Sequence, residues 1–340
     1  MSDRTPQWGK VRLDGLRGGE QITRNLTMAM TGDKIPHAIL IVGSPGTGKT
    51  TLAHAIANAA MCSSPVRGSP CGVCTACKMI IQGTAPELTY IAPDDKGLIP
   101  VNIVRRAIEA MQLKPAYAAR KVVIVDDCDA MNAQAQNAFL KTLEEPPATG
   151  MLILTTSHPD TLLPTVISRV SRFDIDRASE EETISYIASE HPAYYAQAHF
   201  LHTYTGGATG QIDRICADPG FMELRDTCLS HFTAMVSDGP DAAFLFAEWL
   251  EREQDKEDHI LHMLMTFYSD LLMLQVGFVD RVANRDYQAK LSPLLEFVDA
   301  DKCLKGTAAI DEYRRRRRAM VNISLCCGAL GVALTVAKGT

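Results

Sequence analysis

The chain has 340 residues, 46% of them hydrophobic and 22% charged, and a formal net charge of -6 at pH 7. This composition predicts a soluble globular protein of two or three domains and argues against one that coats nucleic acid through its overall charge. No run approaches the roughly 20 apolar residues of a membrane span, and the N-terminus lacks the apolar segment of a signal peptide, so we expect a cytoplasmic protein without a membrane partner.

The first half of the chain alternates strand-like and helical segments. Three apolar runs of strand length end in small or polar residues: 38–43, 122–127 and 151–156. Such continuous runs are typical of strands buried on both faces of a parallel sheet. Helical periodicity marks the segments 50–62, 103–113 and 130–147, the last of which ends at two prolines. This alternation predicts an α/β doubly wound domain.

After Phe173 we expect no further strands, and from about residue 220 onward we expect amphipathic helices only. Ser179 and Glu182 have the spacing of a capping box, which predicts a helix start. The stretches "TGGATG" (205–210) and "ADPG" (217–220) predict breaks between helices. We therefore predict three parts: a nucleotide-binding domain at 1–176 with a cysteine-rich insertion at 61–78, a small helical lid at 177–219, and an all-α C-terminal domain at 220–340.

The glycine-rich stretch "GSPGTGKTT" follows the first predicted strand and opens a helix, which is the context that the P-loop pattern G-x4-G-K-[ST] requires. In this pattern backbone N–H groups surround phosphate oxygens, Lys49 reaches the β- and γ-phosphates, and the Thr50 hydroxyl binds Mg2+. We therefore predict binding of ATP or ADP with Mg2+. The predicted binding residues are Gly43, Ser44, Pro45, Gly46, Thr47, Gly48, Lys49, Thr50, Thr51 and Asp126.

Two aspartates end the strand predicted at 122–127. Asp126 is placed to hold Mg2+ through water. Asp127 stands where related ATPases carry a Glu that polarises the attacking water, and its side chain is one methylene shorter. Because misplacing a catalytic group by about 1 Å can cost about 100-fold in rate, we expect the chain's own ATP hydrolysis to be weak or absent. The alternative is that both aspartates only cap the strand end.

Four cysteines have the spacing C-x8-C-x2-C-x2-C. Disulfides are not expected under reducing conditions, whereas four thiolates presented by such turns form a closed tetrahedral Zn2+ site. A closed site has no open coordination position, so the predicted zinc is structural. Free core thiols or a redox relay are the alternatives. The predicted ligands are Cys62, Cys71, Cys74 and Cys77, and the other six cysteines are predicted to fill the core.

A P-loop followed by a four-cysteine module of this spacing resembles the bacterial DNA polymerase III clamp-loader subunits, which are AAA+ proteins. The stretch "NAFLKTLEEPP" (137–147) is very close to the family's helix after the Walker B acids. The stretch "LILTTSHPDTLLPTVISRVSRF" (152–173) is similar to its sensor 1 and S-R-C segment. The resemblance covers about residues 8–215. It implies an AAA+ domain, a helical lid and a helical collar that packs with partner collars into a ring.

The resemblance also implies roles for single residues. Thr156 maps to sensor 1, and Arg169 maps to the arginine that enters the neighbouring subunit's nucleotide site in trans. Val170 replaces the family's cysteine, and Gly210 aligns with the sensor 2 arginine of active subunits. With Asp127 in place of Glu, this pattern resembles delta-prime, a stator that serves its neighbour's site, more than a gamma/tau motor.

The implied function is to help load the sliding clamp onto primed DNA, with gamma/tau and delta as partner subunits and with the clamp and primer-template DNA reached through the complex. One alternative is a gamma/tau-type motor that hydrolyses ATP itself. Another is a stand-alone P-loop nucleic-acid enzyme whose zinc knuckle grips DNA. The five arginines at 314–318 leave a further question open. A helix directs only two or three of them to one face, so they either contact DNA or form a solvated or inter-subunit face.

Overall fold

The computed structural model describes residues 35–66 and 68–335. The described chain forms two compact units, an α/β unit that ends at Glu182 and also includes 208–210, and a helical unit that contains the remainder. The separate lid and collar predicted from the sequence stay a prediction. The first 34 residues of the predicted nucleotide-binding domain and the last five of the predicted C-terminal domain lie outside the described residues. Among the helices described, none has the length and hydropathy needed to cross a membrane.

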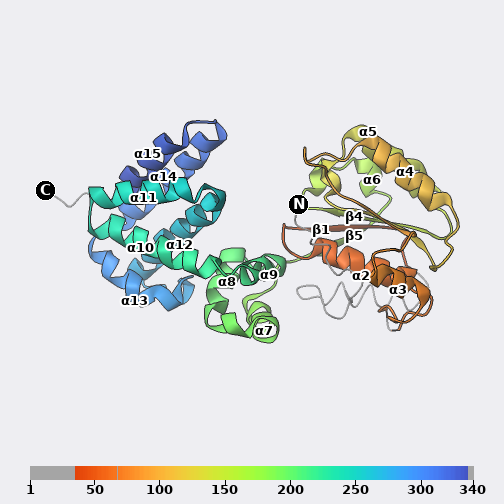
Figure 1. The fold of residues 1–340 in the computed structure, drawn as a ribbon, viewed down its shortest axis with the longest axis horizontal. Coiled ribbons are helices and arrows are strands. Elements are labelled where there is room, and N and C mark those ends of the chain that lie inside the picture. Colours follow the sequence, from red (N-terminus) through yellow and green to blue (C-terminus); the bar gives the residue numbers. More distant parts are fainter. Residues whose placement is uncertain (1–34, 67, 336–340) are drawn as a thin grey trace. The chain divides into compact units, whose positions relative to one another are not determined.

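The α/β unit is built on a five-stranded, fully parallel sheet in the order β2-β3-β4-β1-β5 (Figure 1). Its strands are β1 (Ala38–Gly43), β2 (Leu88–Ile91), β3 (Lys121–Val125), β4 (Gly150–Thr156) and β5 (Ser171–Ile175). In the central register, Ile41 of β1 lies between Thr155 of β4 and Phe173 of β5. The three strands predicted from apolar runs are all present, and they occupy the centre of the sheet. The two edge strands, β2 and β5, were not predicted.

Helices cover both faces of the sheet (Figure 1). They are α2 (Lys49–Met61) and α3 (Thr75–Ile81) on one face, and α4 (Val101–Gln112), α5 (Ala133–Glu144) and α6 (Pro164–Ile167) on the other. Successive side chains of a strand point to opposite faces, so β1 contributes Ile39 and Ile41 to the core beneath α2 and Leu40 to the core beneath α4 and α5. This arrangement confirms the predicted doubly wound α/β domain.

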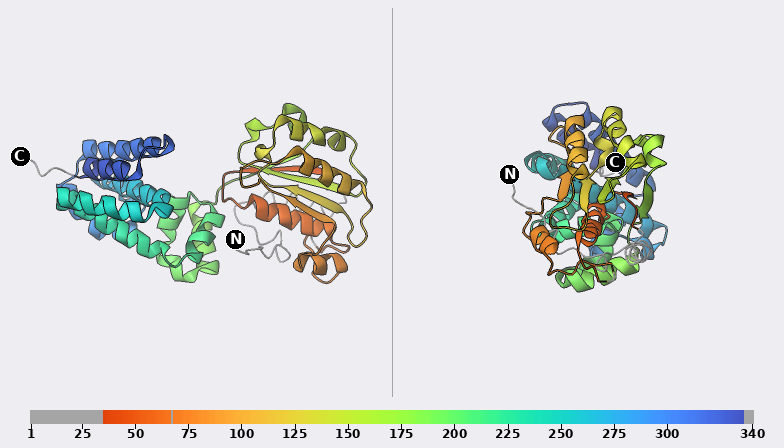
Figure 2. Two further views of the ribbon diagram at one scale, coloured as in Figure 1. Left: turned by 45° about the horizontal axis from the view of Figure 1, so that its top comes forward. Right: turned by 90° about the vertical axis from the view of Figure 1, so that its right-hand side faces the viewer.

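The second unit is helical throughout (Figure 2). Its helices are α7 (Glu180–Glu190, whose first turn belongs to the α/β unit), α8 (Ala198–Thr205), α9 (Thr209–Ala217), α10 (Phe221–Ser237), α11 (Pro240–Arg252), α12 (Glu257–Gln275), α13 (Gln288–Leu291), α14 (Ala300–Arg318) and α15 (Ile323–Leu334). One apolar core extends from Ile187 to Leu334. The predicted capping box is confirmed, because the Ser179 N–H donates to Glu182 Oε2 (2.7 Å) and the Glu182 N–H donates to Ser179 Oγ (3.2 Å).

A buried arginine organises the helical unit. Arg225 of α10 is only 1% exposed, and its guanidinium donates to both carboxylate oxygens of Asp286 at 2.7 Å and to the Asn284 side-chain oxygen. The same guanidinium lies between the rings of Phe200 (3.6 Å) and Tyr287 (4.0 Å). A buried charge is tolerated only when it is paired and hydrogen-bonded, and this arrangement satisfies both conditions. Arg225 thereby ties α8 and α10 to the segment that precedes α13.

Candidate functional site

The P-loop connects β1 to α2 at the carboxyl edge of the sheet, where open α/β sheets bind their ligands. Gly46 and Gly48 have φ angles of 81° and 89°, in the left-handed region that favours glycine. The Thr47 N–H and hydroxyl both donate to the Ser44 carbonyl, at 3.3 and 2.9 Å. Residues 43–51 therefore form a closed turn whose backbone leads directly into the first turn of α2.

Lys49, the first residue of α2, is held at this loop. Its side chain is 6% exposed, and Nζ donates to Ser157 Oγ (2.8 Å) and to the Ser44 carbonyl (3.2 Å). Burial lowers the pKa of Lys49, and the nearby negative charge of Asp127 partly opposes that shift. The Lys49 ammonium therefore lies beside the backbone turn that would surround phosphate oxygens.

Asp126, which follows β3, accepts hydrogen bonds from three hydroxyl groups. Thr50 Oγ1 donates to both of its oxygens (2.9 and 3.0 Å), Thr155 Oγ1 donates to Oδ1 (2.5 Å), and the Tyr90 hydroxyl donates to Oδ2 (2.7 Å). The structure thus brings together Thr50 and Asp126, the pair that the sequence assigned to Mg2+. Carboxylate and hydroxyl oxygens suit that hard cation. Thr155 and Tyr90 were not among the predicted residues.

The neighbouring residues are arranged less simply. Asp127 is exposed, has a φ of 45°, and donates its N–H to Thr155 Oγ1. Although the residue is exposed overall, desolvation of its carboxyl group, followed by the charge of Asp126, raises the pKa of Asp127. Thr156 is fully buried, and its hydroxyl donates to Asp129 Oδ1 (2.7 Å). The hydroxyl that contacts Lys49 is therefore not that of Thr156, the residue predicted as sensor 1, but that of Ser157, the next residue.

Gly210 lies against the P-loop. Its N–H donates to the Gly46 carbonyl at 2.9 Å, and a Cβ atom at position 210 would lie 3.0 Å from the same oxygen. That separation is shorter than the ordinary contact distance of about 3.5 Å between non-bonded heavy atoms. The position that aligns with sensor 2 therefore contacts the loop through its backbone.

Arg169 follows α6 on an exposed part of the surface. Its guanidinium pairs with Glu144 of α5 (2.8 Å) and donates to the Thr165 carbonyl (3.0 Å) and to Ser168 Oγ (3.2 Å). The two side chains of the Arg169–Glu144 pair are 36% and 53% exposed. These contacts orient the arginine without burying it.

The four predicted zinc ligands converge on one point. All four sulfur atoms lie within 4.8 Å of one another, with Sγ–Sγ distances of 3.9 Å between Cys62 and Cys74 and 4.0 Å between Cys71 and Cys77. Zinc bonded tetrahedrally to sulfur at about 2.3 Å requires sulfur atoms about 3.8 Å apart. None of the four forms a disulfide. The cysteines therefore fit a tetrahedral metal site.

Backbone amides support the same cluster. N–H groups of Ser64 and Cys71 donate to the Cys62 sulfur, and those of Cys74 and Cys77 donate to the sulfurs of Cys71 and Cys74. Burial opposes ionisation of Cys74, but amide and hydroxyl donors outweigh it and lower the pKa of Cys74 to about 6. Metal binding requires thiolates. The donors favour them at Cys71 and Cys74, whereas burial raises the pKa of Cys62 and Cys77. The remaining cysteines are buried, except Cys216, which is half-buried, and they agree with the core assignment: Cys128, Cys216, Cys228, Cys303, Cys326 and Cys327.

Comparison with known proteins places this architecture in a family. A family model described as DNA polymerase III, delta subunit, matches residues 18–179, and a model of the C-terminal part of that subunit matches residues 219–327. DNA polymerase III subunit delta-prime of Bacillus subtilis is 26% identical over 89% of this chain and 92% of its own length. Subunit delta-prime of Pseudomonas aeruginosa is 37% identical over 39% of this chain and 41% of its own.

DNA polymerase III subunit tau of Bacillus subtilis is 35% identical over 51% of this chain, and this chain spans only 30% of the length of that relative. The parallel sheet, the P-loop after β1, the acidic pair after β3 and the helical C-terminal region confirm the predicted AAA+ fold. The delta-prime relative matches along nearly the whole chain, and the two delta-subunit models match residues 18–179 and 219–327. We conclude that the chain belongs to the clamp-loader subunits of DNA polymerase III.

Proposed function

We propose that the chain is a delta-prime-type stator of a cytoplasmic clamp loader. It binds ATP or ADP with Mg2+, hydrolyses ATP weakly or not at all, and helps its partners load the sliding clamp onto primed DNA. Its partners would be the gamma/tau and delta subunits, and through them the clamp and primer-template DNA. The full-length similarity to a delta-prime chain, set against partial similarity to tau chains, supports this choice.

The contact between Thr50 and Asp126 beside Lys49 is the observation on which nucleotide binding rests. When bound, Mg2+ would neutralise phosphate charge. The Thr50 oxygen would face the ion while its hydroxyl hydrogen continues to be donated to Asp126. Lys49 would donate to phosphate oxygens in place of Ser157. Asp127 occupies the position of the catalytic Glu, and its side chain is one methylene shorter and exposed to solvent. The shorter side chain supports weak hydrolysis at this site.

Arg169 would act on the neighbouring subunit's nucleotide. Its half-exposed guanidinium is held by a single carboxylate, that of Glu144, and an exposed ion pair of this kind contributes only about 0–1 kcal/mol. A trans arginine accelerates phosphoryl transfer by about 10^3 to 10^5, which corresponds to about 4–7 kcal/mol of transition-state stabilisation. Breaking the Arg169–Glu144 pair therefore costs little by comparison.

Zinc would stabilise the segment 62–77, which holds few core residues of its own. Cys62 ends α2, and Cys77 lies in α3, so a shared metal would fix the second helix to the first. The site has four protein ligands and no free position, which supports a structural role.

The central experiment measures ATP turnover by the reconstituted loader with clamp and primed DNA, comparing wild type with Lys49→Ala and Arg169→Ala. A stator predicts a loss of at least about tenfold at the neighbouring site for Arg169→Ala and little change for Lys49→Ala. Arg172→Ala is the matched control, because Arg172 is also exposed and paired with one carboxylate, that of Asp174. A large loss for Lys49→Ala would instead identify a gamma/tau-type motor.

Nucleotide binding is tested separately by titrating the isolated chain with fluorescent ADP, where Lys49→Ala should abolish the signal. DNA binding by the isolated chain through the cysteine knuckle would favour the stand-alone nucleic-acid enzyme. Metal content by mass spectrometry should give one zinc per chain for wild type. The ion should be lost in Cys74→Ser and retained in Cys216→Ser, which alters a cysteine outside the cluster.

A further inference from the structure

The arginine run at the end of α14 divides between two faces of the helix. Arg315 and Arg316 point outward and pair with Glu312 of the same helix, at 3.0 and 2.8 Å. Arg314, Arg317 and Arg318 instead line a cavity between α14 and α12. The expectation that only two or three of the five would share a face therefore holds.

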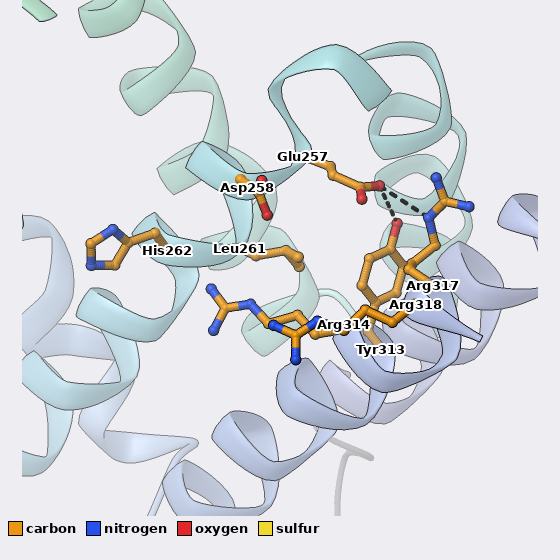
Figure 3. A pocket seen from close by; sticks show the side chains of 8 residues that line it. All are labelled: Glu257, Asp258, Leu261, His262, Tyr313, Arg314, Arg317 and Arg318. Atoms are coloured by element: carbon orange, nitrogen blue, oxygen red, sulfur yellow. Dashed lines mark hydrogen bonds and ion pairs between the residues drawn. The ribbon is translucent and has the colours of Figure 1, made fainter. Parts of the chain in front are cut away.

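The cavity has a volume of about 740 Å³ and lies entirely within the helical unit (Figure 3). The first two turns of α12 form one wall, with Glu257, Asp258 and His262. The last two turns of α14 form the opposite wall. This volume is within the range of sites that hold ligands of nucleotide size, about 300–1,000 Å³.

One arginine of the cavity is already neutralised. Arg317 Nε donates to Glu257 Oε2 at 3.2 Å, and the Tyr313 hydroxyl donates to the same oxygen at 3.0 Å (Figure 3). These side chains are mostly shielded, with 29% of Arg317 and 21% of Glu257 exposed. The Arg317–Glu257 ion pair therefore links α14 to α12 across the cavity, and each charge neutralises the other.

The other two arginines keep their charge available. Arg314 has only a long contact with Asp311, at 3.7 Å, and Arg318 has no ion pair within the described part of the chain. Figure 3 shows both guanidinium groups projecting into the space between the helices. The carboxylate of Asp258 is the one opposing charge on the far wall that is not already paired with an arginine. The α14 wall thus carries an excess of positive charge.

Arg314 and Arg318 are four residues apart on α14 and both line the cavity. Residues four apart on a helix have Cβ atoms about 6 Å apart, a separation similar to that of successive phosphates in a nucleic-acid strand. Guanidinium groups bind phosphate oxygens in a bidentate manner. The exposed His262 ring at the edge of the cavity, stacked on Tyr204 at 4.3 Å, adds a surface on which a base can stack. This combination favours a nucleic acid over an acidic peptide.

We propose that the cavity between α12 and α14 binds two successive phosphate groups of a single nucleic-acid strand through Arg314 and Arg318. The Arg317–Glu257 ion pair fixes the separation of the two walls. The Asp258 carboxylate weakens binding because it repels the phosphate backbone of the strand. The site lies in the C-terminal region and does not depend on the P-loop, so it extends the proposed function without resting on nucleotide binding.

The test measures anisotropy of a fluorescent oligothymidylate with the full chain over a range of salt concentrations. Arg314→Gln/Arg318→Gln should weaken binding at least about tenfold, because two charge-assisted contacts are lost. The slope of log affinity against log salt should fall by about 1.4. The matched control is Arg315→Gln/Arg316→Gln, which removes the same charge from the outward face and should leave the slope nearly unchanged.

Asp258→Asn provides a test that misfolding cannot imitate, since it should tighten binding. Equal losses in both arginine pairs would overturn the proposal in favour of diffuse attraction, and the absence of oligonucleotide binding by wild type would also overturn it. Binding of inorganic tripolyphosphate in place of the oligonucleotide would identify a free polyphosphate site and overturn the assignment to a strand. Lys49→Ala should leave the oligonucleotide signal intact, which separates this outcome from a failure of nucleotide binding.

Discussion

His54 makes the stability of the α/β unit depend on pH. The residue lies on α2, is 2% exposed, and its ring packs against that of Tyr90 at 5.4 Å. Burial lowers the pKa of His54 to about 4, although the charge of Asp126 opposes the shift. In the unfolded chain the pKa of His54 is near 6.5. Between about pH 6.5 and pH 4, His54 is therefore protonated in the unfolded chain and neutral in the folded chain.

The sign follows from proton linkage: stability is fully present above about pH 6.5 and is lost as the pH falls toward 4. A separation of about 2.5 pH units corresponds to about 3 kcal/mol in total, of which about 2 kcal/mol is lost between about pH 7 and pH 5. His54→Phe keeps an aromatic ring beside Tyr90 and removes the titration. The variant should therefore lose about 2 kcal/mol less than wild type over that interval.

Amide hydrogen exchange in peptides from β1 and α2, corrected for the intrinsic exchange rate at each pH, measures the opening free energy of this unit alone. His158→Gln is the matched control, because its side chain is 70% exposed, and it should follow wild type. If His54→Phe loses as much stability as wild type between the two pH values, the proton is not excluded by burial at this position and the reasoning is wrong.

Three further outcomes are expected. Tyr90→Phe removes one hydrogen bond to the Asp126 carboxylate. It should reduce the gain in ADP affinity that Mg2+ provides by about threefold to tenfold and leave the ADP affinity without Mg2+ unchanged. The control Tyr117→Phe, at an exposed tyrosine, should leave the ADP affinity unchanged with and without Mg2+ in the same titration. Arg225→Met leaves buried polar partners unpaired and should lower the urea-unfolding free energy of the helical unit by about 3 kcal/mol, whereas exposed Arg252→Met should change it by less than about 0.5 kcal/mol. Chelation of zinc should raise hydrogen exchange in residues 62–77 and leave the central strands protected; uniform loss of protection would show that the metal supports the whole unit.

The sequence predicted the centre of the sheet better than its edges. β1, β3 and β4 are flanked by strands on both sides and covered by helices on both faces, so their sequences are continuous apolar runs. β2 and β5 are the edge strands, and polar residues such as Thr89 and Arg172 interrupt them. Because an edge strand is partly solvated, it lacks the pattern by which the central strands were recognised.

The candidate site shows the same division. Residues 43–51 and the four cysteines are contiguous motifs, and spacing alone located them. Tyr90 and Ser157 reach the site from β2 and from the end of β4, so their roles depend on strand order, which no local pattern encodes. A polar residue directly after a central strand, as Ser157 is, was the available signal. An aromatic residue on an unpredicted edge strand gave none.

The hydrogen bond from Gly210 to Gly46 limits how this chain can change. A methyl group at position 210 would already press on the Gly46 carbonyl, so a longer side chain there would displace the phosphate loop before its far end reached any ligand. An arginine at this position would therefore require the main chain to shift by a few tenths of an ångström before its side chain could be accommodated. For the proposed stator, an arginine at position 210 alone would therefore not be enough to build a sensor 2 contact, because the backbone of the phosphate loop would have to shift as well.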